Sequence, residues 1–200
     1  MQEGCAYSRR AALGLGGLAS CALISASYSS PNWAAGPAET SPPTPPEVQA
    51  EFPGAQALGS ATLRFLGLAI YEARLWVQSG FNASMYAQSP LALELNYFRN
   101  LSGALIAERS LKEMRRQGPL SDERRQAWLQ AMVLAFPDVK AGDRITGLHT
   151  PGVGARFWFN GQSRPALNDP DFSRTFFGIW LSDATSEPLM RNQLLGRGAV

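Results

Sequence analysis

The sequence contains very few of the side chains that most metal and nucleophile sites require. Its 200 residues include one histidine, His149, and two cysteines, Cys5 and Cys21, which both lie close to the N-terminus. A zinc site built from histidine and cysteine therefore cannot be assembled from one chain outside the N-terminal region. A catalytic triad would have to pass through His149, which precedes a loop and has no evident partner. The sequence also lacks the common nucleotide-binding and metal-protease motifs, so no cofactor is expected.

A strong net charge is missing as well. The formal charge is +2, and the basic run at 115–125 contains acidic residues and no interleaved aromatic side chains. This pattern is typical of a solvated helix surface, so no nucleic-acid partner is expected. Hydrophobic residues make up 45% of the chain, which is enough for one domain with a proper core.

The N-terminus has no apolar run long enough to cross a membrane. Arg9-Arg10 is followed by uncharged residues 11–26, which are rich in Gly as well as Ala and Leu, whereas a spanning helix needs about 20 apolar residues. A charged segment before a short apolar one is typical of an export signal, and the paired arginines resemble a twin-arginine signal. We therefore expect residues 1–27 to be a cleaved signal peptide that engages the export machinery and directs the chain to the periplasm.

Two alternatives for the N-terminus remain open. The stretch LASC, ending at Cys21, resembles a lipid-attachment motif, although the apolar run continues past it. An uncleaved anchor would also associate the chain with a membrane through its N-terminus. Residues 28–54 are rich in Pro, Ser and Ala and are interpreted as a linker, so the folded domain is expected over residues 55–200.

Hydrophobic periodicity and turn residues predict the order strands, two helices, strands, two helices. The stretches 57–64 and 65–76 are expected to form one or two strands, with Gly67 at a bend or bulge. Further strands are expected over 91–98, 144–150, 155–159 and about 163–167. Helices are expected over 101–117, 122–136, from Asp169-Pro170 onward, and from Thr185 or Ser186 to Gly196. This order favours an α+β fold in which one layer of helices covers a mostly antiparallel sheet.

The stretch 61–76 contains the main candidates for a ligand-binding site. Near its centre, the odd-numbered and the even-numbered residues are both apolar, which predicts a central strand covered on both faces. Gly67 and Ala69 leave room either for a closely packed helix or for a cavity that holds an apolar ligand. Arg64, which leads into this stretch, is then either the partner of an acidic head group or a structural ion-pair or edge residue. Tyr97, at the end of a strand, either donates its hydroxyl to a ligand or is an ordinary half-buried tyrosine.

Five segments together resemble a known family. They read GSATLRFLGLAIYEARLW, LELNYFRNLSGALIAERSLKEM, GDRI, FWFNG and DFSRTFFGIWLSDATSEPLMRNQLLG. They are similar to the bacterial chalcone-isomerase-like domain over about residues 55–197, and the last segment is the most specific. The resemblance implies an open-faced β-sandwich, in which a large antiparallel sheet carries a layer of helices. Relatives of this family include plant chalcone isomerases and plastid fatty-acid-binding proteins.

The resemblance also implies which residues would form a site. Arg64 matches the strand arginine that anchors the ligand's phenolate or oxyanion in true isomerases. Leu66 matches the strand threonine that orders a water, and Ile179, followed by Trp180, matches a hydroxyl residue near the C-terminus. Each lost oxyanion donor removes about 3 kcal/mol of transition-state stabilisation, so chalcone isomerase activity is not expected.

We therefore expect an exported, non-catalytic protein that binds a fatty acid or a similar amphiphilic carboxylate. The expected ligand-binding residues are Arg64, Leu66, Leu68, Tyr71, Tyr97, Ile179 and Trp180. Two alternatives are an isomerase or intramolecular lyase with an unknown substrate, and a structural or interaction module without a ligand.

Overall fold

A computed structural model describes residues 43–198 of the chain. Its strands are β1 (Gln56–Phe65), β2 (Leu68–Val77), β3 (Leu91–Tyr97), β4 (Arg144–Thr150), β5 (Gly154–Phe159) and β6 (Gln162–Ser163). Its α-helices are α1 (Pro46–Glu51), α2 (Gly103–Met114), α3 (Asp122–Ala135), α4 (Pro170–Leu181) and α5 (Pro188–Leu194). Two short 3₁₀ helices complete the list, η1 (Ala83–Gln88) and η2 (Arg115–Gln117).

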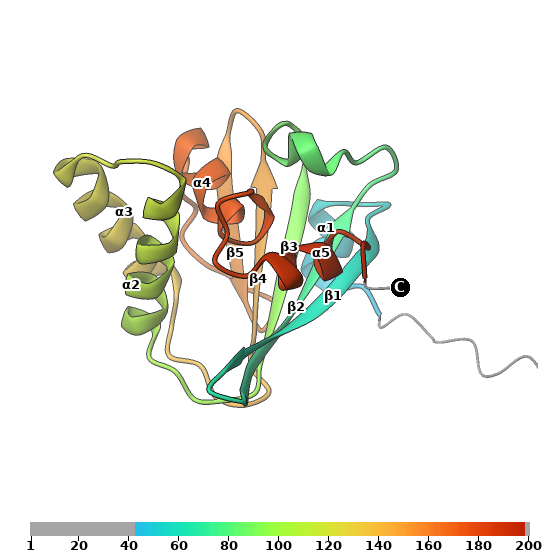
Figure 1. Ribbon diagram of the computed structural model, residues 1–200, viewed down its shortest axis with the longest axis horizontal. Coiled ribbons are helices and arrows are strands. Elements are labelled where there is room, and N and C mark those ends of the chain that lie inside the picture. The colour runs from blue at the N-terminus through green and yellow to red at the C-terminus, as the bar shows by residue number, and fades with distance from the viewer. Residues whose placement is uncertain (1–42, 199–200) are drawn as a thin grey trace, which may run out of the picture. The chain divides into compact units, whose positions relative to one another are not determined.

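The six strands form one antiparallel sheet in the order β1-β2-β3-β4-β5-β6, so every strand lies beside its neighbour in sequence. Helices α2 and α3 are inserted between β3 and β4, and α4 and α5 follow the last strand (Figure 1). This arrangement confirms the predicted α+β fold with an antiparallel sheet and a layer of helices.

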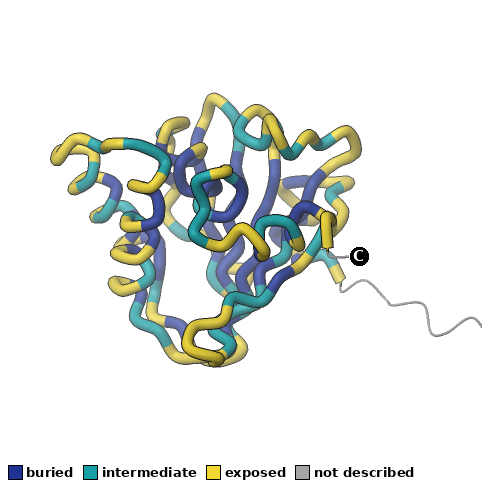
Figure 2. Tube along the Cα trace, viewed as in Figure 1, coloured by how far each residue is buried: buried dark blue, intermediate teal, exposed yellow. Residues whose placement is uncertain are grey.

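The main core lies between the sheet and helices α2 to α5. Alternate strand residues such as Leu75, Leu93 and Phe157 point to this face and are almost fully buried. In Figure 2 the buried segments run along the central strands and along α4. The predicted helix starts at 122 and 170 are confirmed, because the side chains of Ser121 and Asp169 accept hydrogen bonds from the backbone N–H groups of the first turns.

The opposite face of the sheet is partly covered by α1, which the sequence did not predict. Val48 and Phe52 are buried against Trp76, Leu148 and Trp158. The predicted linker therefore extends too far at its C-terminal end, since residues 46–52 belong to the folded domain. The short length of α1 and its Pro-rich approach hide this helix from periodicity arguments, which need several turns.

The expectation that the stretch 61–76 forms a central strand covered on both faces is wrong, although the chain does turn at Gly67 as expected. Phe65 ends β1, Leu68 begins β2, and Leu66-Gly67 form a tight turn between them. The apolar centre of the stretch is thus the tip of a hairpin, and β1 lies at the edge of the sheet (Figure 1). The pattern was misread because a leucine stands where such turns normally carry asparagine or glycine.

The expected signal, residues 1–27, and most of the expected linker lie outside the described residues. Within residues 43–198, no helix combines the length and apolar character needed to cross a membrane.

Candidate functional site

A cavity of about 340 Å³ lies between the sheet and helices α2, α4 and α5. Helix α2 packs mainly against α3 and α4, so it stands off the sheet and leaves space beneath it. Most of the wall is apolar and comes from all of these elements. It includes Leu95, Leu101, Ile106, Phe136, Ile145 and Phe176. The volume falls at the lower end of the range for small-molecule sites, which is about 300–1,000 Å³.

One part of the wall carries a pair of hydrogen-bonding aromatic residues. The indole Nε1–H of Trp180 on α4 donates to the hydroxyl of Tyr71 on β2 at 3.0 Å. Burial raises the pKa of the Tyr71 hydroxyl, and the bond from Trp180 only partly offsets this rise. Tyr71 is therefore protonated at neutral pH, and its own O–H remains available to donate to a ligand.

Tyr97 lies beside Tyr71 in the same wall. The two residues are paired across β2 and β3, and their rings meet edge to face with centroids 5.7 Å apart. Burial also raises the pKa of Tyr97, so this hydroxyl stays protonated too. Among the described residues, no hydrogen bond of the Tyr97 hydroxyl is found, which leaves a second donor facing the cavity.

Helix α2 adds an ion pair to the lining. Arg109 Nη2 lies 2.8 Å from Glu113 Oε1. The positive charge of Arg109 lowers the pKa of Tyr71 and so opposes part of the rise that burial causes. Glu113 is nine-tenths buried, and its Oε2 has no hydrogen-bond partner among the described residues, although Arg116 Nε lies 3.8 Å from it. The cavity is thus apolar with one polar region near Tyr71.

The rim of the cavity is formed by the end of β1. Arg64 and Phe65 line the cavity but are exposed, and Arg64 Nη1 donates to the carbonyl oxygen of Gly67 at 3.4 Å. Residues 43–198 supply no ion-pair partner for Arg64. Because β1 is an edge strand that ends in a turn, Arg64 occupies an edge position, which was one of its expected alternatives, and its guanidinium lies at the entrance.

The structure brings most of the predicted site residues together at this cavity. They are Arg64, Tyr71, Tyr97, Ile179 and Trp180. Leu66 and Leu68 do not line it, because they belong to the exposed turn and the start of β2. Sequence reasoning missed Arg109 and Glu113, although their i,i+4 spacing from each other on an amphipathic helix was a usable signal.

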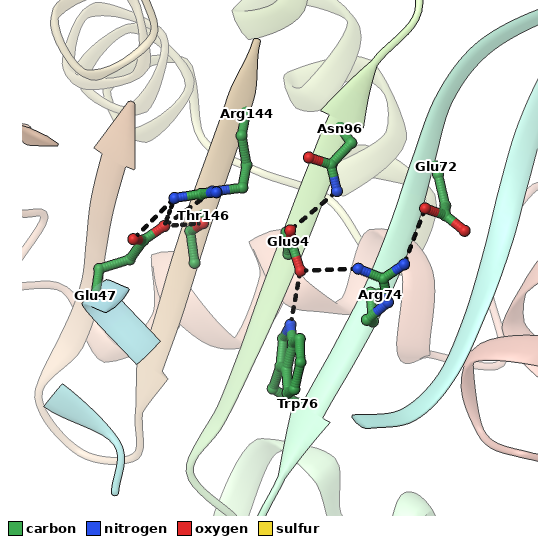
Figure 3. A network of polar contacts seen from close by, with 8 residues as sticks. All are labelled: Glu47, Glu72, Arg74, Trp76, Glu94, Asn96, Arg144 and Thr146. Atoms are coloured by element: carbon green, nitrogen blue, oxygen red, sulfur yellow. Dashed lines mark hydrogen bonds and ion pairs between the residues drawn. The ribbon is translucent and has the colours of Figure 1, made fainter. Parts of the chain in front are cut away.

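A second group of polar side chains lies on the other face of the sheet (Figure 3). Glu94 accepts hydrogen bonds from Arg74, Trp76 and Asn96 at 3.0 to 3.3 Å, and Arg74 also pairs with Glu72. Every carboxylate oxygen of Glu94 therefore has a partner. The group consists of satisfied structural pairs.

His149 also has a structural position. Its Nδ1 lies 2.6 Å from Ser173 Oγ and its Nε2 lies 3.1 Å from the Ala87 carbonyl oxygen. Burial lowers the pKa of His149, so the ring is neutral at neutral pH. Through these contacts His149 connects β4 to η1 and α4, and it does not line the cavity. The described residues contain no cluster of three or more metal-ligating side chains.

Comparison with known proteins agrees with this architecture. A family model described as chalcone isomerase-like matches residues 57–196, so the chain belongs to the chalcone isomerase-like family. Among solved structures, the chain is similar to a fatty-acid-binding protein of Arabidopsis thaliana. The TM-score is 0.55 at 12% sequence identity, and the match covers 72% of this chain and 87% of the plant protein. A comparison with curated protein sequences gives no significant match.

Proposed function

We propose that the chain binds a fatty acid or a similar amphiphilic carboxylate in the cavity and does not catalyse a reaction on it. The observation that carries this proposal is the composition of the wall: an apolar chamber with two protonated tyrosine hydroxyls and the Arg109–Glu113 ion pair in one region, and with Arg64 at the rim. An alkyl tail matches the apolar part, and a carboxylate matches the hydroxyl and guanidinium donors. The plant fatty-acid-binding protein with the same fold supports this choice of ligand class.

The arrangement favours binding over catalysis. The residue expected to replace the water-ordering threonine, Leu66, lies in an exposed turn, and Ile179 contributes an apolar side chain to the wall. Naringenin chalcone should therefore cyclise no faster with the protein than without it. A clear acceleration would instead support the isomerase alternative.

The direct test is calorimetric titration of the purified full chain with palmitate, together with mass spectrometry of lipids extracted from it. Ile179→Trp places a large side chain in the cavity wall and should abolish binding while the circular dichroism spectrum is retained. Leu134→Trp makes a similar enlargement at an exposed position of α3 and serves as the matched control. Saturable binding that survives Ile179→Trp, or no binding by the wild type, would contradict the proposal.

We also propose that the chain is exported to the periplasm through the twin-arginine route. The sequence of residues 8–26 supports this proposal, as described above. Replacing Arg9 and Arg10 with lysine should leave the precursor in the cytoplasm, as measured by cell fractionation. An unchanged periplasmic yield would contradict this route, and an intact N-terminus in the membrane fraction would support an anchor instead.

A further inference from the structure

Residues 43–198 contain two tight hairpin turns whose central residues have nearly the same φ values but different sequences. In the β5–β6 hairpin, Asn160 and Gly161 have φ values of 50° and 82°. In the β1–β2 hairpin, Leu66 and Gly67 have φ values of 49° and 79°. Positive φ at both central residues is the pattern of the type I′ turn, for which Asn-Gly is strongly preferred. The first turn meets this preference and the second does not.

Leu66 is unfavourable for the backbone and gains nothing from packing within the domain. A side chain with a Cβ clashes in the left-handed region, and asparagine tolerates that region much better than leucine. Leu66 is 86% exposed, so no core contact within residues 43–198 compensates for this strain. A strained residue that packs against nothing within residues 43–198 points to a contact outside these residues.

Leu66 is the centre of an exposed apolar patch. Phe65 and Leu68 flank it and are 61% and 49% exposed. Phe98, 47% exposed, lies beside the same end of the sheet, because its backbone N–H donates to the carbonyl oxygen of Ile70. We call Phe65, Leu66, Leu68 and Phe98 the hairpin patch. In Figure 2 the tip of the β1–β2 hairpin is yellow, at the bottom of the view.

Two arginines lie at the hairpin patch. Arg64 is held at the tip by its bond to Gly67, and Arg99 Nε donates to the carbonyl oxygen of Ala69 at 3.1 Å. The two segments that build the tip, 52–71 and 95–107, contain no acidic residue. The neighbouring loop 137–143 carries Asp138 and Asp143, whose carboxylates accept hydrogen bonds from the backbone N–H groups of Gly103 and Lys140. Exposed leucine and phenylalanine flanked by arginine is the composition that inserts into the interface of an anionic lipid bilayer.

We propose that the tip of the β1–β2 hairpin docks the domain onto an anionic lipid bilayer, with the hairpin patch inserted among the lipids and Arg64 and Arg99 against their phosphates. Phe65 and Arg64 also line the cavity, so docking places the cavity entrance at the bilayer surface. This second consequence rests on the proposed function: an amphiphile could then pass between membrane and cavity without crossing water. The docking itself does not depend on any ligand.

The test must separate the hairpin patch from the apolar N-terminal segment of the chain. We would use the full chain with Cys5→Ser and Cys21→Ser, and attach one fluorophore at Phe98→Cys or, as a control, at Gln130→Cys on α3. Vesicles of phosphatidylcholine with phosphatidylglycerol would carry nitroxide groups on their acyl chains. The label at position 98 should be quenched and the label at 130 should not. Quenching should fall strongly in vesicles of phosphatidylcholine alone.

Leu66→Asn is the decisive variant. It removes the apolar side chain but restores the residue that the other hairpin uses, so it should raise the unfolding temperature and weaken vesicle binding through the tip on the order of ten-fold. Equal quenching at 98 and 130, or unchanged quenching in Leu66→Asn, would overturn the proposal. So would a lowered unfolding temperature, since Leu66 would then be packed within the chain.

A wild-type dimer that Leu66→Asn dissociates, without vesicle quenching, would assign the patch to a second copy instead. Palmitate affinity in solution should be the same in both proteins, so failure of docking and failure of ligand binding can be told apart.

Discussion

At the scale of single residues, the solvent exposure of a charged side chain decides how much it contributes to ligand binding. The sequence left Arg64 either as the partner of an acidic head group or as an ion-pair or edge residue, and a buried partner would make a strong hydrogen bond. Arg64 lies at the exposed rim, where solvent screens its interaction with any ligand. The interior donors are Tyr97, which is almost fully buried, and Tyr71, which is partly buried, so a ligand inside the cavity meets them with less competition from water than it meets at Arg64.

The first prediction concerns Arg64. Arg64→Met should weaken palmitate binding by no more than about 1 kcal/mol, because ion pairs in contact with solvent contribute little. The free energy of unfolding should hardly change, since the described residues give Arg64 no ion-pair partner. Calorimetric titration and chemical denaturation would check both values. A loss of several kcal/mol in affinity would show that Arg64 turns inward when the ligand binds.

The second prediction concerns Tyr71. Tyr71→Phe removes the O–H that can donate to a ligand and should weaken palmitate binding by about 0.5–1.5 kcal/mol, the usual net contribution of a hydrogen bond. Tyr86→Phe is the matched control, because the Tyr86 hydroxyl also makes one hydrogen bond, to the carbonyl oxygen of Arg174, but does not line this cavity. Equal effects of the two variants would remove Tyr71 from the binding site.

At the scale of elements, α1 shows how a short helix can be fixed by one buried ion pair. Glu47 accepts hydrogen bonds from Arg144 Nε and Nη2 at 3.1 and 3.0 Å and from Thr146 Oγ1 at 2.7 Å (Figure 3). The Glu47 side chain is only 2% exposed. The helix is too short to be stable alone, so its place on the sheet depends on this carboxylate and on Val48 and Phe52.

The third prediction compares the two glutamates of α1. Glu47→Ala should lower the free energy of unfolding by about 3 kcal/mol, because it leaves Arg144 partly buried without its partner. Glu51→Ala should cost less than about 1 kcal/mol, because the pair of Glu51 with Arg156 is open to solvent. Urea denaturation of both variants would check the difference. Equal losses would mean that α1 is held by its apolar residues alone.

The elements also show what a sequence reveals and what it hides. Strands such as β4 and the helix starts at Ser121 and Asp169 were predicted correctly, because alternation and capping are local signals. A bend was expected at Gly67, but the tight turn at Leu66-Gly67 was not, because its sequence contradicts the usual turn preference. The Arg109–Glu113 pair at the cavity was missed because only the packing of α2 against α4, which depends on distant residues, brings it beside Tyr71.

At the scale of the whole molecule, the wall of the cavity links global stability to pH. The pKa values of Tyr71 and Tyr97 are both raised, chiefly because burial disfavours the charged phenolate. In the unfolded chain these hydroxyls lose their protons near pH 10, the usual value of about 10 for tyrosine. The folded chain keeps both protons at that pH. As the pH rises above about 10, the unfolded state therefore binds fewer protons than the folded state, and the stability falls.

The fourth prediction puts this into numbers. Above about pH 10, each of the two tyrosines should lower the free energy of unfolding by about 1.4 kcal/mol per pH unit. Tyr97→Phe should remove one such contribution, and Tyr71→Phe combined with Tyr97→Phe should remove both. Urea denaturation of the three proteins between neutral and alkaline pH would measure the slopes, with neutral pH setting each baseline. Parallel curves for the wild type and Tyr97→Phe would show that the Tyr97 hydroxyl ionises as easily in the folded protein as in the unfolded chain. The cavity would then be open to water at that point, and a hydroxyl there could not serve as a desolvated anchor for a ligand.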